Sequence, residues 1–315
     1  MTLTQLGAFV LVARLGSVRA AAEVLGVSEP AVSQALAALR RHFDDDLITR
    51  AASGMALTPG GQRLMGIASQ MVGLGAEAES AVRAAQGAPE RLRVVATSEI
   101  AELVAPSLLE EFSARIGGVE TSLGVATTAE MPVLLQSRLA DVALGPPLDP
   151  AGGVESTAVM RCHLVVVAAP SLGPAISSER LAAATWLVDP CGADPDSPVA
   201  ELLAAWHVPE HRIQVFPSQT AAWAAAASGL GVAPAIAHLV EPELRQGRLR
   251  RIDLPGVPLE RRWHLSSLMA DRRPRAAGAF QHFAATPQGM QLMHKPGQGV
   301  PPSRFRPPVY VTIWS

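Results

Sequence analysis

The polar face of one short segment carries residue types that can read DNA. Between residues 32 and 39 the apolar side chains recur at helical spacing, which predicts one buried stripe of a helix. The opposite face carries Glu29, Pro30, Ser33, Gln34 and Ala37. Glutamine and serine hydrogen-bond to base edges in the major groove, and a glutamate can accept from the amino group of cytosine. We therefore expect this face to contact bases.

Three polar pairs open expected helices at positions suited to binding a small molecule. Thr97-Ser98 and Thr127-Thr128 each follow an expected strand, and Gln219-Thr220 opens a helix in a later segment. Free N–H groups at a helix start, together with hydroxyls, suit a carboxylate or another small anion. Arginine is not evident near these pairs, so they favour a monoanion or a neutral polar molecule. The alternative is that each pair only caps its helix.

The motifs of common enzyme and metal chemistries are missing from the sequence. It has no Gly-x-Ser-x-Gly motif, no His-Glu-x-x-His motif and no P-loop. His207 and His211 have a spacing that metal ligands can have, but Pro209 interrupts the helix that they would need. Cys162 and Cys191 are solitary, and we expect buried thiols. We therefore expect no catalytic residues, no metal site and no cofactor, with an enzyme as a disfavoured alternative.

Three short helices are expected to position the base-reading face. Gly16 ends the first helix, Ser17 caps the second, and Gly26 ends the second. Ser28 is placed to cap the third helix, with Pro30 in its first turn. The third helix therefore follows the second across a short turn.

The second and third helices have the spacing of a helix-turn-helix. Ala22 lets the two helices cross closely, Gly26 tolerates the turn conformation, and Val32 wedges the helices together. Such a unit presents the outer face of its second helix to the major groove. An αα-hairpin within a helical bundle is the alternative.

A short β-hairpin is expected beside these helices. Residues 47–50 and 55–57 flank a turn at Gly54, and Arg50 at the base of this wing could reach a phosphate. With the wing included, the segment resembles the LysR-type transcriptional regulators. The resemblance rests on Leu6, Phe9, Gly16-Ser17, Ala21-Ala22, Leu25, the run from Val27 to Gln34, Leu39, Leu47 to Arg50, and Leu57-Thr58-Pro59-Gly60-Gly61.

The resemblance implies a regulator of transcription that binds double-stranded DNA sequence-specifically. The residues that would face base edges are Glu29, Pro30, Ser33 and Gln34, and those that would position phosphates are Ser17, Arg19, Ser28, Arg50 and Thr58. The charge of the segment departs from a typical DNA binder, because residues 1–60 carry five arginines and five acidic residues. Asp44-Asp45-Asp46 stands where the family typically has a glycine-containing turn.

A long helix is expected after the wing, capped by Thr58 and continuing to about Gly87. At 1.5 Å per residue it reaches about 40 Å, too long for one domain to bury alone. Its apolar residues alternate by three and four, as in a coiled-coil seam, at Leu64, Ile67, Met71, Leu74, Ala78, Ala81 and Ala85. A single helix lying across its own domain is the alternative. In the LysR-type family this helix pairs antiparallel with its copy, so the resemblance implies a homodimer through residues 59–87, and a homotetramer.

The remaining two thirds of the chain alternate strand and helix patterns, which predicts α/β sheets with helices on both faces. One helix is expected over 99–113 and one strand over 164–168. The effector domain of the family resembles the two-lobed periplasmic binding proteins of type 2, with the chain crossing between lobes twice. The three polar pairs fall where that domain lines its effector cleft.

The expected organisation has four parts. These are a winged helix-turn-helix DNA-binding domain (1–58), a dimerisation linker helix (59–88), an effector-binding domain (89–290) and a proline-rich C-terminal extension (291–315). Lobe one takes residues 90–161 and 266–290, and lobe two takes 162–265. We expect the extension to pack along the effector domain or a neighbouring subunit.

Composition limits the other classes. The 315 residues are 49% hydrophobic and 17% charged with a net charge of −2, which allows several packed cores and excludes a disordered chain. The longest uncharged stretch, 213–240, contains prolines and polar residues and fails as a membrane span. The start has no secretory pattern, so a cytoplasmic location is expected.

The expected function is a LysR-type regulator whose DNA binding responds to a small monoanionic or polar effector held between two lobes. Its expected partners are double-stranded DNA, the effector, further copies of itself and RNA polymerase, with no membrane. The alternative is a solute-binding or sensing module with a weak or vestigial DNA-binding head.

Overall fold

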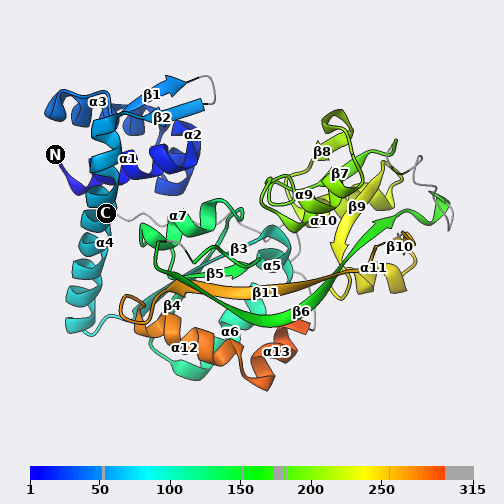
Figure 1. Ribbon diagram of the computed structural model, residues 1–315. Coiled ribbons are helices and arrows are strands. Elements are labelled where there is room, and N and C mark those ends of the chain that lie inside the picture. Colours follow the sequence, from blue (N-terminus) through cyan, green and yellow to red (C-terminus); the bar gives the residue numbers. More distant parts are fainter. Residues whose placement is uncertain (52–53, 151, 173–180, 182, 255, 295–315) are drawn as a thin grey trace.

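The computed structural model describes residues 1–51, 54–150, 152–172, 181, 183–254 and 256–294 (Figure 1). Its N-terminal unit comprises α1 (Leu3–Leu15), α2 (Val18–Leu25), α3 (Glu29–Phe43), β1 (Ile48–Ala51) and β2 (Gly54–Leu57). The two strands pair antiparallel, with Ile48 opposite Leu57. The expected helix-turn-helix and its wing are confirmed.

The boundaries of these helices follow from the residues at their ends. The hydroxyl of Ser17 accepts a hydrogen bond from the N–H of Ala20 and caps α2. Gly16 and Gly26 adopt the left-handed conformation that ends α1 and α2. Ser28 stands at the cap position of α3, but its side chain makes no capping bond, which differs from the expectation.

The core of the N-terminal unit fixes which face of α3 points outward. Phe9 and Val12 of α1 pack with Val32, Leu36 and Leu39 of α3, and all five side chains are buried. Burying such a side chain contributes about 1.5–3 kcal/mol relative to leaving it exposed. The polar face of α3 is therefore left on the surface.

The long helix α4 (Pro59–Ala85) begins against the wing. The Thr58 hydroxyl accepts from the N–H of Gly61 at 2.9 Å and donates to the Asp45 carboxylate at 2.7 Å. Asp45 also accepts from the N–H of Leu47 at 2.7 Å, and these two bonds lower the pKa of its carboxyl. A Cβ atom at Gly61 would collide with the carbonyl oxygen of Leu47. The acidic run thus supplies one residue that joins the wing to α4.

Helix α4 has two apolar faces, so the expected seam is divided. Leu64 and Met71 pack against the core of the N-terminal unit of the same chain. Ile67 and Leu74 lie on the surface, with 58% and 63% of their area exposed. The expected seam residues thus have different surroundings within one chain, because an alternation of three and four fits both faces of a half-buried helix. The dimer contact itself stays a prediction.

One nine-stranded sheet in two lobes follows α4, with strand order β4-β3-β5-β11-β6-β9-β7-β8 and β10 paired with β6 (Figure 1). The strands are β3 (Glu90–Ala96), β4 (Val119–Val125), β5 (Val142–Gly145), β6 (Val154–Ala168), β7 (Trp186–Val188), β8 (Ile213–Val215), β9 (Val232–Ile236), β10 (Arg250–Arg251) and β11 (Leu259–Leu268). Lobe one carries helices α5 (Ser98–Leu103), α6 (Ala105–Ile116), α7 (Glu130–Gln136), α12 (Arg275–Ala284) and α13 (Pro287–His294). Lobe two carries α9 (Pro198–Ala205), α10 (Gln219–Ala227) and α11 (Glu241–Arg245).

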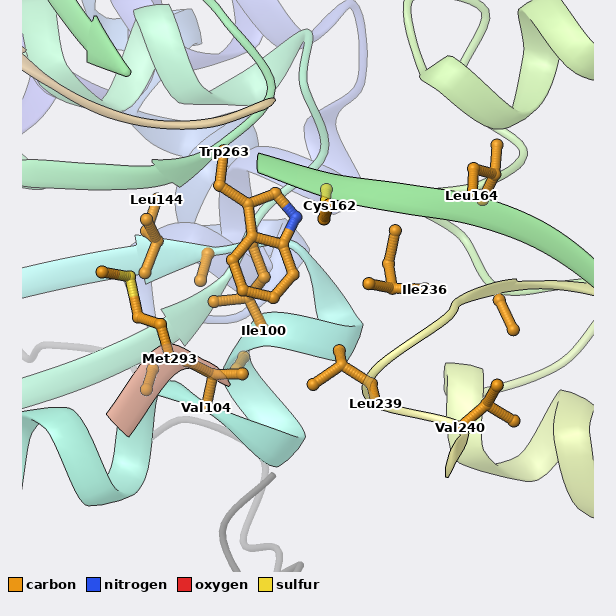
Figure 2. Close-up of a cluster of buried hydrophobic side chains, with 14 of the residues drawn as sticks. Ile100, Val104, Leu144, Cys162, Leu164, Ile236, Leu239, Val240, Trp263 and Met293 are labelled. Carbon is orange, nitrogen blue, oxygen red and sulfur yellow. The ribbon is translucent and has the colours of Figure 1, made fainter. Parts of the chain in front are cut away.

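Strands β6 and β11 pass through both lobes and pair antiparallel with each other. β11 borders β5 in lobe one, and β6 borders β9 in lobe two. The register between the two strands shifts between Trp263 and His264. Figure 2 shows the Trp263 indole with Leu144 to one side and Leu164 and Ile236 to the other, so one hydrophobic core continues from lobe to lobe.

Two elements differ from the sequence expectation. The helix expected over 99–113 is broken at Val104, because Pro106 near the start of α6 has no N–H to continue the helical ladder. The strand expected from Leu164 begins at Val154 instead. The first half of β6 mixes buried and exposed residues irregularly, so it has no clear period-two pattern.

No helix among the described residues is long and apolar enough to cross a membrane. The expectation that the proline-rich extension packs on the effector domain concerns residues from 295 on, which lie outside the described part of the chain.

Candidate DNA-binding face and interlobe cleft

The outer face of α3 is exposed along the residues expected to read bases. Glu29, Pro30, Ser33 and Gln34 are all exposed, on the side opposite the buried stripe. Serine and glutamine on this face keep their hydrogen-bonding groups toward solvent, where base edges would lie. The structure therefore brings the four residues together on one surface.

The residues expected to position phosphates have different surroundings. Arg19 is exposed and forms an ion pair with Glu23 at 3.0 Å. The hydroxyls of Ser17 and Thr58 serve as helix caps, whereas Ser28 is exposed. Arg50 lies in β1, but its side chain is outside the described part of the structure. A DNA phosphate at Arg19 would compete with an existing carboxylate.

Sequence reasoning missed the role of Arg40. Its guanidinium donates to the backbone oxygens of Asp46 at 2.8 Å and Ile48 at 3.0 Å. Arg40 thus holds the start of the wing against α3. Its position in the last turn of a helix expected to be followed by a wing was the available signal.

A cavity of about 470 Å³ lies between the two lobes. Thr97, Glu99 and Thr128 line it from lobe one, and Asp189 and Gln219 line it from lobe two. The crossing strands add further walls with Cys162, Leu164, Arg261, Arg262, Trp263 and His264. The volume is within the usual range of small-molecule sites.

Two of the expected polar residues have free hydrogen-bonding capacity in this cavity. Thr97 and Thr128 are only 5% and 8% exposed, and neither hydroxyl makes a hydrogen bond of ordinary geometry with a described residue, although the Thr97 hydroxyl lies close enough to the Glu99 carboxyl to oppose the rise of its pKa. A buried hydroxyl without a partner costs free energy. Both residues line the cavity, so their hydroxyls are candidates for contact with a bound molecule.

The other expected residues are already committed. Ser98 donates to the sulfur of Cys191 at 3.3 Å, and the Thr127 hydroxyl caps α7 by accepting from Glu130. Gln219 lines the cavity, but its amide donates to the carbonyl of Pro234 at 2.8 Å. Among the expected cleft residues, Thr127 is therefore only a cap.

The lobes are bridged directly at two further points. Thr220 of α10 donates its hydroxyl to Glu102 of α5 at 2.7 Å. The N–H of Ala129, at the start of α7, donates to Asp194 of lobe two at 2.9 Å. Thr220 therefore joins α10 to α5 across the two lobes, and Asp194 occupies the helix start where a bound anion was expected.

Carboxylates near the cavity were missed by the sequence reasoning. Glu99 lies in the wall, where burial and then the charge of Asp189 raise its pKa to about 7. Asp189 accepts from the N–H groups of Gly192 at 2.8 Å and Cys191 at 3.3 Å. The available signal was position, since Glu99 follows Ser98 directly and Asp189 follows a strand expected over 186–188.

The two cysteines are buried, as expected. Burial raises the pKa of Cys162 to about 12 and is also the largest cause of the raised pKa of Cys191. Both thiols are therefore protonated near neutral pH, which makes them poor nucleophiles.

The chain combines a winged helix-turn-helix, whose α3 face is exposed, with a two-lobed domain that encloses a polar cavity. The long helix α4 joins them. This architecture is typical of a DNA-binding protein with a domain that binds a small molecule. The family profile "LysR substrate binding domain" matches residues 85–286, and "Bacterial regulatory helix-turn-helix protein, lysR family" matches residues 3–62. The chain belongs to the LysR family of bacterial transcriptional regulators. It is therefore a DNA-binding regulator with an effector-binding domain.

Individual relatives agree with this assignment. The chain is 36% identical to an uncharacterized HTH-type transcriptional regulator of Mycobacterium tuberculosis (strain CDC 1551 / Oshkosh), over 100% of both chains. It is 30% identical to the RuBisCO operon transcriptional regulator of Allochromatium vinosum, over 90% of this chain and 95% of that one. The fold is similar to full-length CbnR in complex with its target DNA, with a TM-score of 0.52, 22% identity, and coverage of 90% of this chain and 98% of that one.

Proposed function

We propose that this regulator binds its target DNA as a homodimer in the cytoplasm and that a small molecule in the interlobe cavity changes its affinity for that DNA. The observation that carries the proposal is a pair of buried hydroxyls, Thr97 and Thr128, which line a cavity of about 470 Å³ and make no hydrogen bond of ordinary geometry within the described part of the chain. Native proteins pair most buried polar groups. A ligand that both lobes contact can favour one arrangement of the lobes over another.

Within this proposal, base edges are read by the exposed face of α3, with Ser33 and Gln34 as hydrogen-bonding residues. Ser17, Arg19, Ser28, Arg50 and Thr58 position the backbone of the DNA. Thr58 does so through the N-terminus of α4 that it caps, because its hydroxyl is already bonded to Asp45.

The dimer contact in this proposal is the exposed face of α4. Ile67, Leu74 and Val82 lie there with more than half of each residue exposed. Large apolar side chains in a row along one helix usually mark a contact surface. Assembly of dimers into a tetramer and contact with RNA polymerase follow from family membership as further parts of the proposal.

The test is a fluorescence-anisotropy titration with a labelled duplex from the region upstream of the protein's own gene. We expect tight binding relative to a scrambled duplex, and a change in affinity when a small-molecule extract of the source cells is added. Dialysed extract is the control. Equal binding to both duplexes would favour the rival function, a solute-binding module with a vestigial DNA-binding head.

A further inference from the structure

The basic side chains that line the interlobe cavity have acidic neighbours, but not every acidic side chain there has a basic neighbour. On one wall, Arg261 pairs with Glu201 at 2.7 Å, and Arg262 lies 4.0 Å from Glu260. Each arginine therefore has a carboxylate nearby, although the buried Nε of Arg261 has no hydrogen-bond partner among the described residues. In the same cavity, Glu99 contributes a carboxylate that forms no ion pair with a described basic residue, and Asp189 lies close enough to raise its pKa.

Backbone N–H groups that would suit an anionic ligand are already bonded to carboxylates of the protein. Asp194 accepts from the N–H at the start of α7, and Asp189 accepts from two backbone N–H groups in the opposite lobe. Helices α5 and α7 have only six and seven residues, so their dipoles are small. An added anion would meet carboxylates where the sequence suggested free donors.

The hydroxyls and the Glu99 carboxyl suit a ligand that donates several hydrogen bonds. The Thr97 and Thr128 hydroxyls can accept, and the Glu99 carboxyl accepts through both oxygens when it is ionised. A positively charged ligand would stabilise that ionised form, which burial and Asp189 now disfavour. Charge-assisted hydrogen bonds to such a carboxylate are stronger than neutral ones.

The rest of the cavity fits an organic ion. Leu164, Ile236 and the ring of Trp263 supply apolar walls that could cover an alkyl chain. No group of three or more His, Cys, Asp or Glu side chains among the described residues is arranged to hold a metal ion. A bare divalent cation therefore does not fit this cavity.

We infer that the interlobe cavity binds a small organic cation, an ammonium or guanidinium compound with an apolar portion, whose charged end lies between Glu99 and Thr128. The inference rests on the proposed effector role of the cavity and names the chemical class of its ligand. It replaces the monoanion or neutral polar molecule that the sequence alone favoured.

Three probes of similar shape test the charge directly on the full-length protein. These are n-butylguanidinium, its neutral analogue n-butylurea, and the anion pentanoate, with binding measured by ligand-observed NMR and calorimetry. We expect the cation to bind at least about tenfold more tightly than the urea, as for one charge-assisted contact. Equal or tighter binding of n-butylurea or pentanoate would overturn the inference.

Variants of the cavity residues test whether the cation binds between Glu99 and Thr128. Glu99→Gln should weaken n-butylguanidinium about tenfold or more, whereas Glu110→Gln, a surface change outside the cavity, should leave it unchanged. Thr128→Val should also weaken it, and circular dichroism and melting temperature check that each variant folds. Unchanged affinity in folded Glu99→Gln and Thr128→Val proteins would refute this placement.

A parallel anisotropy titration separates this inference from the proposed regulation. Binding of the cation that is lost in Glu99→Gln, with no change in DNA affinity, would support the cation site and refute its regulatory role. A change in DNA affinity produced by pentanoate and not by n-butylguanidinium would support regulation and overturn the cationic ligand.

Discussion

Glu99, the residue proposed to bind the cation, lowers the folding stability of the ligand-free protein. Its carboxyl is held in the cavity wall near the carboxylates of Asp189 and Glu102, and its pKa is raised from 4.5 to about 7. The folded chain therefore holds a proton there that the unfolded chain releases between these two values. Glu99 opposes folding above neutral pH, where the carboxylate must be ionised.

We predict that Glu99→Gln raises the stability of the ligand-free protein. Because the folded state binds more protons between pH 4.5 and about 7, the unfolding free energy attributable to Glu99 falls as pH rises through that window. Glutamine removes the penalty, on the order of 1–3 kcal/mol above pH 7. Urea unfolding at acidic and alkaline pH should show a gain only at the alkaline end, and a loss of stability there would contradict the assignment.

A second prediction separates base-reading from phosphate-positioning residues. Arg50→Ala should weaken binding to all duplexes about equally and reduce the salt slope by roughly one unit, since it removes one phosphate contact. Gln34→Ala should instead change which sequence is preferred. Anisotropy at several salt concentrations measures both effects, and a uniform loss in both variants would remove the distinction.

The positions of Thr97 and Thr128 after expected strands were enough to predict the hydroxyls of the cavity. They did not predict the charge of the cavity. Thr97 and Thr128 follow strands, and the carboxyl ends of strands in α/β sheets line binding clefts. The like charge beside Glu99 and the ion pair of Arg261 depend on residues far away in sequence, Asp189 and Glu201. The sign of the charge inside the cavity therefore depends on the folded arrangement of both lobes and cannot be predicted from the local sequence.

At the scale of elements, the sequence predicts where a helix begins or ends when a capping residue sets the boundary. It does not predict which face of a long helix is buried. Gly16, Gly26 and Thr58 act locally, so α1, α2 and α4 end or begin where the sequence indicates. The division of α4 between its own domain and the surface depends on how α1 packs, which the spacing of Leu64 and Ile67 does not encode.

Two glycines of α4 should respond oppositely to alanine. Gly61→Ala places a methyl group against the carbonyl of Leu47 and should destabilise the protein by about 1–3 kcal/mol. Gly66→Ala meets open space in the middle of the helix and should stabilise it by about 0.5–1 kcal/mol. Equilibrium urea unfolding measures both, and equal effects would contradict the close contact between α4 and the wing.

The exposed face of α4 gives a prediction about assembly. Ile67→Glu with Leu74→Glu should convert dimers to monomers, because it buries charges in the proposed contact. Gln62→Glu, on another face of the same helix, is the control. Light scattering at low micromolar concentration measures the mass, and dimers that persist in the double variant would place the interface elsewhere.

At the scale of the whole molecule, α7 connects the cavity to the DNA-binding unit. Its start is bound to Asp194 of lobe two, and at its other end Gln136 accepts from Arg14 of α1. Val133 and Leu139 pack against the core that holds α3. Movement of lobe two relative to lobe one would therefore reach the reading helix through packed side chains.

We predict that Gln136→Ala reduces the coupling between ligand and DNA. It removes the acceptor of the half-buried Arg14 at the contact between α7 and α1. The change in DNA affinity caused by n-butylguanidinium should shrink, and by reciprocity DNA should then shift the affinity for the cation by the same smaller factor. Gln288→Ala, on the far side of lobe one, is the control, and an undiminished response would exclude this route.

The shared sheet has a consequence for how such a regulator can diversify. Lobe boundaries drawn at residues 161 and 265 cut through the middle of β6 and β11, and the core around Trp263 draws side chains from both lobes. Recombination could not exchange one lobe for that of a relative, because the exchange would cut β6 and β11, which both lobes share. New ligand preferences must instead arise one side chain at a time within an intact domain, and a charge swap at a position such as Glu99 is a short step of that kind.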